Sequence, residues 1–95
     1  MITIHKYDVP EEDYFELELP VGAQILTVQD QFGKPYIWIL KDTEQILEMR
    51  YFKLIGTGHN FKSSLRKIKQ YIGTFQLVGG ALVLHLFEMY GKGEI

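Results

Sequence analysis

The dipeptide Gly79-Gly80, which lies between two apolar runs, constrains the fold of this chain more than any other feature. Two successive glycines can both adopt the positive φ angles that a two-residue hairpin turn requires. We therefore expect residues 71–88 to form an antiparallel hairpin whose register is fixed by the turn. The expected pairs are Val78 with Ala81, Leu77 with Leu82, Gln76 with Val83, Phe75 with Leu84, Thr74 with His85, Gly73 with Leu86 and Ile72 with Phe87.

Both faces of this hairpin are largely apolar, because successive side chains of a strand point to opposite sides. One face is expected to be core and consists of Phe75, Leu77, Leu82, Leu84 and Leu86, with Gly73 beside them. The other face is a candidate interface and consists of Ile72, Thr74, Gln76, Val78, Val83, His85 and Phe87. An exposed apolar patch of this size usually marks an interface. Either a second sheet of the same domain or another subunit covers it, and we favour a homo-oligomer.

Alternation of apolar and polar residues continues upstream and predicts strands over residues 3–9, 14–19, 24–31, 36–41 and 46–55. The spacing in 46–55 also suits a helix, but its β-branched and aromatic residues favour a strand. Residues 61–70 are the one helix candidate, or else a mobile basic loop. The expected fold is mainly β: one domain over residues 1–95, a small antiparallel sandwich or barrel-like structure of about six to seven strands with at most one short helix. A flexible tail is expected from about residue 89.

Charge is unevenly distributed along the chain, although the net charge is only −2. Residues 8–18 contain six acids and no base, and residues 62–69 contain four bases and no acid. The simplest interpretation is two solvated faces. Alternatively, the basic segment binds an anion or the acidic segment of a second copy. The small net charge argues against nucleic acid as a partner.

The sequence carries no sign of secretion or of membrane insertion. It contains no cysteine, which excludes disulfides and thiolate metal sites. It has neither the apolar core of a signal peptide nor an apolar run long enough to span a bilayer. We therefore expect a soluble, cytoplasmic protein with no membrane partner.

The segment Gly56-Thr57-Gly58-His59-Asn60 resembles a ligand-binding loop more than any other part of the chain. Glycines allow the backbone to approach a ligand closely, and successive amides in such a turn can form an anion-binding nest. Bases follow shortly afterwards. The candidate anion-binding residues are Gly56, Thr57, Gly58, His59, Asn60, Lys62, Arg66 and Lys67. As a connection between two elements, the loop needs no ligand at all.

Catalytic and metal-binding motifs are missing from the sequence. His5, His59 and His85 are too far apart to show the local spacing of a zinc motif, so we expect neither a metal nor a cofactor. There is no GxSxG segment and no cysteine nucleophile, and we name no catalytic residue. His85, opposite Thr74, is most simply a hydrogen-bonded histidine. An enzyme would need a pocket that unites His59 with a carboxylate.

The hairpin also carries a family resemblance. The segments that carry it are Tyr71-Ile72-Gly73-Thr74-Phe75-Gln76-Leu77, Gly79-Gly80-Ala81-Leu82-Val83 and His85-Leu86-Phe87-Glu88. They resemble the signature of a family of short phage and prophage proteins of unknown function. The resemblance implies a phage-encoded accessory protein that acts in a bacterial cytoplasm. The basic stretch 62–69 departs from the family pattern, which weakens any inference that the whole family binds anions.

Three functional hypotheses follow. The first is a non-enzymatic accessory protein, homo-oligomeric, that binds a host-derived target and counters host defence by sequestering an anionic nucleotide signal. The second is a structural or protein-interaction module that docks on a virion or host protein through the candidate interface of the hairpin. The third is an enzyme of unspecified reaction.

Overall fold

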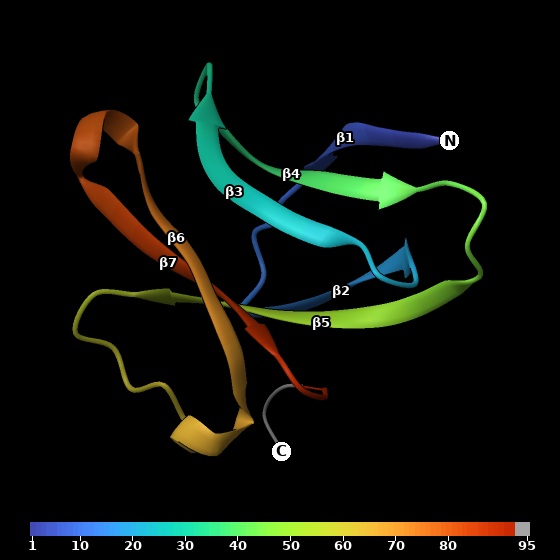
Figure 1. Cartoon of the computed structure of the whole chain (residues 1–95). Coiled ribbons are helices and arrows are strands. Elements are labelled where there is room, and N and C mark those ends of the chain that lie inside the picture. Colours follow the sequence, from blue (N-terminus) through green and yellow to red (C-terminus); the bar gives the residue numbers. More distant parts are fainter. Residues whose placement is uncertain (93–95) are drawn as a thin grey trace.

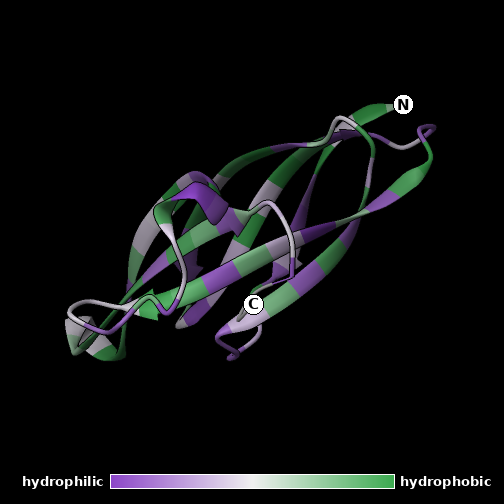
Figure 2. Ribbon diagram, turned by 90° about the horizontal axis from the view of Figure 1, so that it is seen from below, coloured by the Kyte–Doolittle hydropathy of each residue, from purple (hydrophilic) through white to green (hydrophobic). Residues whose placement is uncertain are grey.

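Alternating residues produce strands along most of the chain, as Figure 2 shows by the change of hydropathy from one residue to the next. The computed structural model describes residues 1–92. Within this range two short 3-10 turns, η1 (Leu65–Lys67) and η2 (Val78–Gly80), interrupt the strands. The strands are β1 (Ile2–Asp8), β2 (Tyr14–Pro20), β3 (Gln24–Gln31), β4 (Lys34–Asp42), β5 (Leu47–Gly56), β6 (Ile68–Leu77) and β7 (Leu82–Met89).

The strands form two antiparallel sheets that pack against each other (Figure 1). The smaller sheet has the order β1-β4-β3, and the larger has the order β2-β5-β7-β6. Edge strands β3 and β6 pack closely along one side. The predicted mainly β, sandwich-like fold is therefore confirmed, and of the expected core face of the hairpin Phe75 and Leu86 are buried, whereas Leu77 and Leu84 are half-buried and Leu82 is exposed. Among residues 1–92 no helix is long and apolar enough to cross a membrane.

The core lies between the sheets and is built by inward-facing aliphatic and aromatic side chains. Its most buried apolar members are Leu19, Ile37, Ile39, Phe52 and Leu86. Gly73 belongs here for a steric reason: a Cβ at this position would lie 2.9 Å from Cγ1 of Val28 on β3. The sequence thus keeps a glycine where β6 approaches β3 closely.

The C-terminal hairpin forms in the expected register over five pairs, from Leu77 with Leu82 to Gly73 with Leu86. Gly79 and Gly80 have φ angles of 62° and 94°, as a tight turn of this type requires. Val78 and Ala81 close the turn through a 3.1 Å backbone hydrogen bond instead of pairing in the ladder.

The expected pair of Ile72 with Phe87 is wrong. A bulge between Tyr71 and Gly73 shifts the register by one residue, so that Tyr71 pairs with Phe87. The extra residue of a bulge moves every side chain beyond it to the opposite face. Ile72 therefore does not lie where the hairpin pattern placed it.

Residues 61–70, which the sequence left open as a short helix or a mobile basic loop, do not form the helix. Only the three residues of η1 are helical, and β6 begins at Ile68. Leu65, which would be the centre of the apolar helix face, is 85% exposed, so this face has nothing to pack against. A short helix without tertiary support is marginal, whereas extending β6 adds backbone pairs with β7.

The flexible tail predicted from about residue 89 does not begin there. Met89 is the last residue of β7, pairs with Ile68 and is buried. The amide of Tyr90 still donates to the carbonyl of Lys67, over 3.0 Å. The rest of the predicted tail, residues 93–95, lies outside the described residues.

A buried ion pair joins the two central strands of the larger sheet. The Arg50 guanidinium donates to both carboxylate oxygens of Glu88, with an Nη2–Oε1 distance of 3.0 Å, and to the carbonyl of Ala23 at 2.8 Å. Nζ of Lys69 lies 3.7 Å from the same carboxylate. The hydrogen bond with Glu88 is the main cause that raises the pKa of Arg50 above its ordinary value. The pair ties the β2–β3 turn to the sheet.

Candidate functional site

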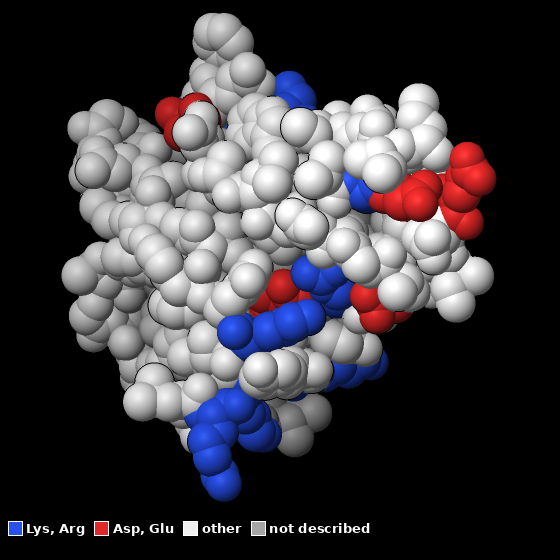
Figure 3. All heavy atoms as spheres, in the orientation of Figure 1, with Lys and Arg blue, Asp and Glu red and all other residues white. Residues whose placement is uncertain are grey.

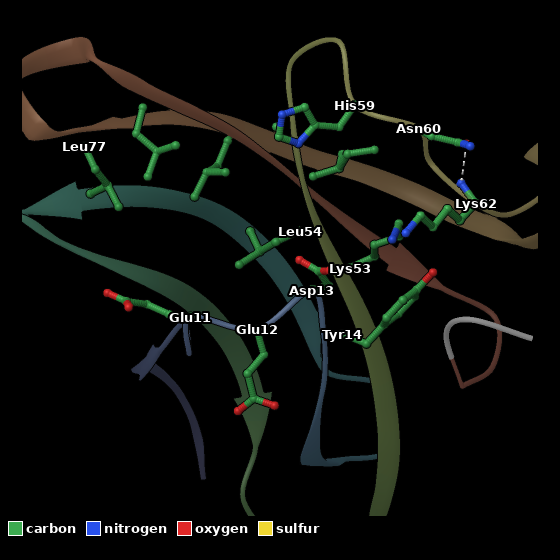
Figure 4. A pocket seen from close by; sticks show the side chains of 14 residues that line it. Glu11, Glu12, Asp13, Tyr14, Lys53, Leu54, His59, Asn60, Lys62 and Leu77 are labelled. Atoms are coloured by element: carbon green, nitrogen blue, oxygen red, sulfur yellow. Dashed lines mark hydrogen bonds between the residues drawn. The ribbon is translucent and has the colours of Figure 1, made fainter.

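A pocket of about 800 Å³ opens at the end of the larger sheet, between the β6–β7 hairpin and the turn that joins β1 to β2 (Figure 4). Its floor is apolar and consists of Leu54, Leu77, Leu82 and Leu84. Leu77 and Leu84 are only half-buried and Leu82 is exposed, because β3 and β4 do not extend over them. A concave apolar floor with polar groups at its rim is the usual form of a ligand site.

The acidic wall of the pocket consists of Glu11, Glu12 and Asp13. Figure 4 shows Glu11 and Glu12 on the side opposite His59, Asn60 and Lys62, and Asp13 beside Lys53. Backbone hydrogen bonds hold this turn in place. The carbonyl of Asp13 accepts from the amide of Leu54 at 2.8 Å. The three acidic side chains are exposed, so they remain accessible to a ligand.

The basic wall is carried by residues 57–64, the segment between β5 and η1. Oγ1 of Thr57 lies 2.6 Å from Nε2 of His85, and Oγ1 of Thr74 lies 2.8 Å from Nδ1 of the same ring. Oδ1 of Asn60 accepts from the amide of Lys62 at 2.9 Å. These bonds anchor the segment on the hairpin, so that it presents its polar side chains to the pocket.

His59 folds back over the glycine that begins the segment. A Cβ on Gly56 would lie 2.9 Å from Cε1 of the His59 ring. Gly56 therefore makes room for the histidine, and not for a ligand as the sequence suggested. Within residues 1–92 no carboxylate lies within 4.0 Å of the ring nitrogens of His59.

The predicted anion-binding residues separate into two groups. Four of them line the pocket: Gly56, His59, Asn60 and Lys62. Thr57 instead points to His85, and Gly58 supplies the positive φ of 83° that the turn needs. Arg66 and Lys67 lie in η1, away from the pocket lining.

The pocket also contains residues that were not predicted as site residues. They are the acidic wall, which belongs to the acidic segment 8–18, the leucines of the floor, Tyr14 and Lys53. Tyr14 and Lys53 are direct cross-strand neighbours on β2 and β5. No local signal marks this pair, because the two residues lie far apart in the sequence and only the order of strands brings them together.

The candidate interface of the hairpin is covered in part by the chain itself. The ring of Phe61 packs edge-on against Phe87 at 5.2 Å between centroids, and Tyr71 lies against the same ring at 5.4 Å. Both ring nitrogens of His85 have hydroxyl partners. A second copy is therefore not needed to cover this part of the face. The residues of that face that stay exposed are Thr74, Gln76 and Val78.

Charge is also segregated on the surface drawn in Figure 3. Lysine and arginine atoms gather below, where Figure 1 places η1, and acidic atoms gather near the end of β4. Within the part of the chain that the structure describes, no group of three or more His, Asp or Glu side chains is placed to hold a metal ion.

Fold and pocket together define a class: a small all-β domain of two packed antiparallel sheets with an open pocket at one end. A family model described as a domain of unknown function, DUF7352, matches residues 1–94, and the chain belongs to this family. Comparison with curated proteins and with solved structures gives no match.

Proposed function

We propose that this protein is a non-enzymatic binding domain that holds a nucleotide-type ligand in the pocket between the acidic turn and residues 57–64. The observation that carries the proposal is the combination of an apolar floor with a rim of opposite charges on facing walls. A volume of about 800 Å³ lies within the range of small-molecule sites.

The chemistry of a nucleotide matches the two walls. A phosphate is attracted to the basic wall, where Lys62 supplies a positive charge and Asn60 an amide. Ribose hydroxyls and base amino groups are hydrogen-bond donors, which the carboxylates of Glu11 and Glu12 can accept. The flat faces of a base or sugar fit the leucine floor. A ligand with several phosphates and no donor group would be repelled by the acidic wall.

The biological setting belongs to the same proposal. The resemblance of the hairpin to short phage proteins supports an accessory protein made by a phage and active in the cytoplasm of its bacterial host. Sequestering a nucleotide signal of the host would counter a defence system. A protein that only binds the signal needs no catalytic group. This agrees with the rim of the pocket, where His59 and the carboxylates are on separate walls and do not form a catalytic pair.

Isothermal titration against cyclic dinucleotides and ADP-ribose derivatives tests the proposal. We expect saturable binding of at least one compound, weakened about tenfold by Lys62→Ala, as the loss of a charge-assisted contact predicts. Arg66→Ala is the matched control, because Arg66 is an exposed base outside the pocket. Absence of binding across the panel by the folded protein would rule out the nucleotide ligand.

A second candidate function is favoured by the outer face of the smaller sheet. Ile2 and Ile4 on β1 are 72% and 51% exposed, and Ile4 pairs with Leu40 on β4. The ring of Trp38 lies on the same face, edge-on to Tyr36 at 6.1 Å. This apolar and aromatic surface supports a protein-interaction module, with a second copy of the chain as the partner. Its test is the oligomeric state in solution.

A further inference from the structure

Lys53 is a buried lysine on the outer face of the larger sheet, and it reaches the pocket. Its cross-strand neighbours are Tyr14 on β2 and Phe87 on β7. Tyr71 on β6 continues the row, and Phe61 packs over Phe87. Among these rings Lys53 is only 4% exposed.

The ammonium group of Lys53 has aromatic rings as neighbours but no counter-charge. Nζ lies 3.9 Å from the centre of the Tyr14 ring and 5.2 Å from that of Phe61. Within the described residues 1–92, no carboxylate forms an ion pair with it. The lysine stem is buried and Nζ keeps some contact with solvent, and the contacts with π faces offset only part of the hydration that the ammonium loses. The group is therefore short of an anionic partner.

A second buried group beside it also lacks a partner. The hydroxyl of Tyr14 is inaccessible to solvent and has no hydrogen-bond partner in the structure described. Buried polar groups are almost always hydrogen-bonded, so each exception calls for an explanation. A cation without a counter-charge and an unpartnered hydroxyl that can donate a hydrogen bond thus lie on neighbouring strands at the same pocket.

The other polar groups at this end of the pocket point to the same ligand chemistry. Lys62 and Asn60 line the pocket together with Lys53 and Tyr14. In Figure 4 the side chains of Lys53, Lys62 and Tyr14 lie on one side of β5, Asp13 is labelled beside Lys53, and Glu11 and Glu12 extend away from them. Ammonium and hydroxyl donors in one place suit an oxygen anion.

We infer that Lys53 and Tyr14 form an oxyanion subsite, which binds a phosphate or carboxylate group of the ligand. This inference rests on the proposed function, because it assigns the anchoring group of the ligand in the same pocket. The bound oxygen accepts from the ammonium of Lys53, and a small shift of the Tyr14 ring lets its hydroxyl donate as well. Lys62 adds charge at the mouth. The leucine floor lies on the other side of β5, so the remainder of the ligand would pass the edge of β5 to contact it.

The test is a titration of ¹⁵N-labelled protein with inorganic phosphate and, in a separate arm, with acetate, followed by amide chemical shifts. We expect saturable shifts at residues 53–56 and 59–62 with at least one of the two anions. Lys53→Met should weaken this binding about tenfold or more, as the loss of a charge-assisted hydrogen bond predicts. Lys34→Met is the matched control, because Lys34 is exposed on β4 outside the pocket.

Tyr14→Phe keeps the ring that packs on Lys53 and removes only the hydroxyl, so it tests the subsite even if Lys53→Met fails to fold. It should weaken anion binding about fivefold, the effect of losing one hydrogen bond. Saturation by phosphate, by acetate or by both supports an oxyanion subsite. Which anion saturates the site shows whether the subsite binds a phosphate or a carboxylate group. Absence of saturable shifts with both anions overturns the inference, and so does unchanged affinity in both variants.

The subsite and the proposed function can fail separately. If a nucleotide binds the pocket with equal affinity in wild type and Lys53→Met, the subsite is wrong and the binding domain stands. If phosphate binds at Lys53 but no nucleotide of the panel binds, the subsite stands and the nucleotide proposal is wrong.

Discussion

At the scale of single residues, the charged side chains inside the molecule were the hardest to foresee. Arg50, Lys53 and Glu88 are buried among residues 1–92, although such residues are rarely buried unless paired. Arg50 and Glu88 satisfy each other across β5 and β7, whereas Lys53 has only aromatic rings. Arg50 and Glu88 therefore stabilise the fold, whereas Lys53 is placed to contact a ligand in the pocket.

Replacing Glu88 by Gln should destabilise the protein by about 3–5 kcal/mol, because the Arg50 charge would stay buried without its counter-charge. Urea unfolding measures this free energy. The double variant Arg50→Met/Glu88→Met is the control, since it removes both charges. It should lose clearly less stability than Glu88→Gln. Equal losses in the two proteins would show that packing, and not the uncompensated charge, dominates at this position.

Gly73→Ala should destabilise the domain by about 1–3 kcal/mol, the usual cost of forcing an extra group into a filled core. The added Cβ would lie 2.9 Å from Cγ1 of Val28, so β3 and β6 would have to separate. Val28→Ala in the same chain should recover part of the loss, which a double-mutant cycle by thermal unfolding detects. Gly91→Ala, where nothing lies within 4 Å of the new Cβ, should be close to neutral.

At the scale of elements, strands with strict alternation were predictable and the connection between β5 and β6 was not. The hairpin formed in the expected register because Gly79 and Gly80 specify it locally. Residues 61–70 have the apolar spacing of a helix, but the pairing of β6 with β7 outweighs this weak local preference. The bulge at Ile72 has no signal in the sequence either.

Only part of the candidate site could be predicted, because a single sequence reveals local patterns but not which distant segments meet. Gly56, His59, Asn60 and Lys62 follow one another in the chain, so a local pattern could identify them. The wall opposite comes from the β1–β2 turn, more than forty positions away in the sequence. The acidic turn and the basic segment face each other because of the strand order β2-β5-β7-β6. No local pattern in a single sequence encodes that order.

Thr57→Val should loosen the segment between β5 and η1, because it removes the hydroxyl that bonds to Nε2 of His85. We expect faster amide hydrogen exchange at Lys62, whose amide donates to Asn60, and a stability loss of about 1 kcal/mol. Thr43→Val is the matched control, since its hydroxyl bonds to the Met1 carbonyl at the other end of the molecule. Exchange at Lys62 that is unchanged in Thr57→Val would contradict the anchoring role of His85.

At the scale of the whole molecule, the two sheets leave different surfaces free. Residues 57–64 cover part of the outer face of the larger sheet, while the outer face of the smaller sheet presents Ile2, Ile4 and Trp38 without a covering segment among residues 1–92. We therefore expect self-association through β1 and β4, and not through the hairpin face that the sequence suggested.

Sedimentation velocity over a range of concentrations tests this choice of surface. We expect a concentration-dependent rise of the sedimentation coefficient that Ile4→Asp abolishes, because a charge would be buried at the interface. Val78→Asp is the comparison, since Val78 is an exposed apolar residue at the tip of the hairpin. Loss of association in Val78→Asp but not in Ile4→Asp would place the interface on the hairpin instead.

Amide chemical-shift mapping with ADP-ribose and a cyclic dinucleotide shows whether the pocket between the acidic turn and residues 57–64 binds a nucleotide-type ligand. We expect saturable shifts confined to residues 11–14, 53–56, 59–62 and 82–84, which surround the pocket. Shifts that cluster instead at residues 2–4 and 38–40, or no saturable shifts with either compound, would contradict the proposed function.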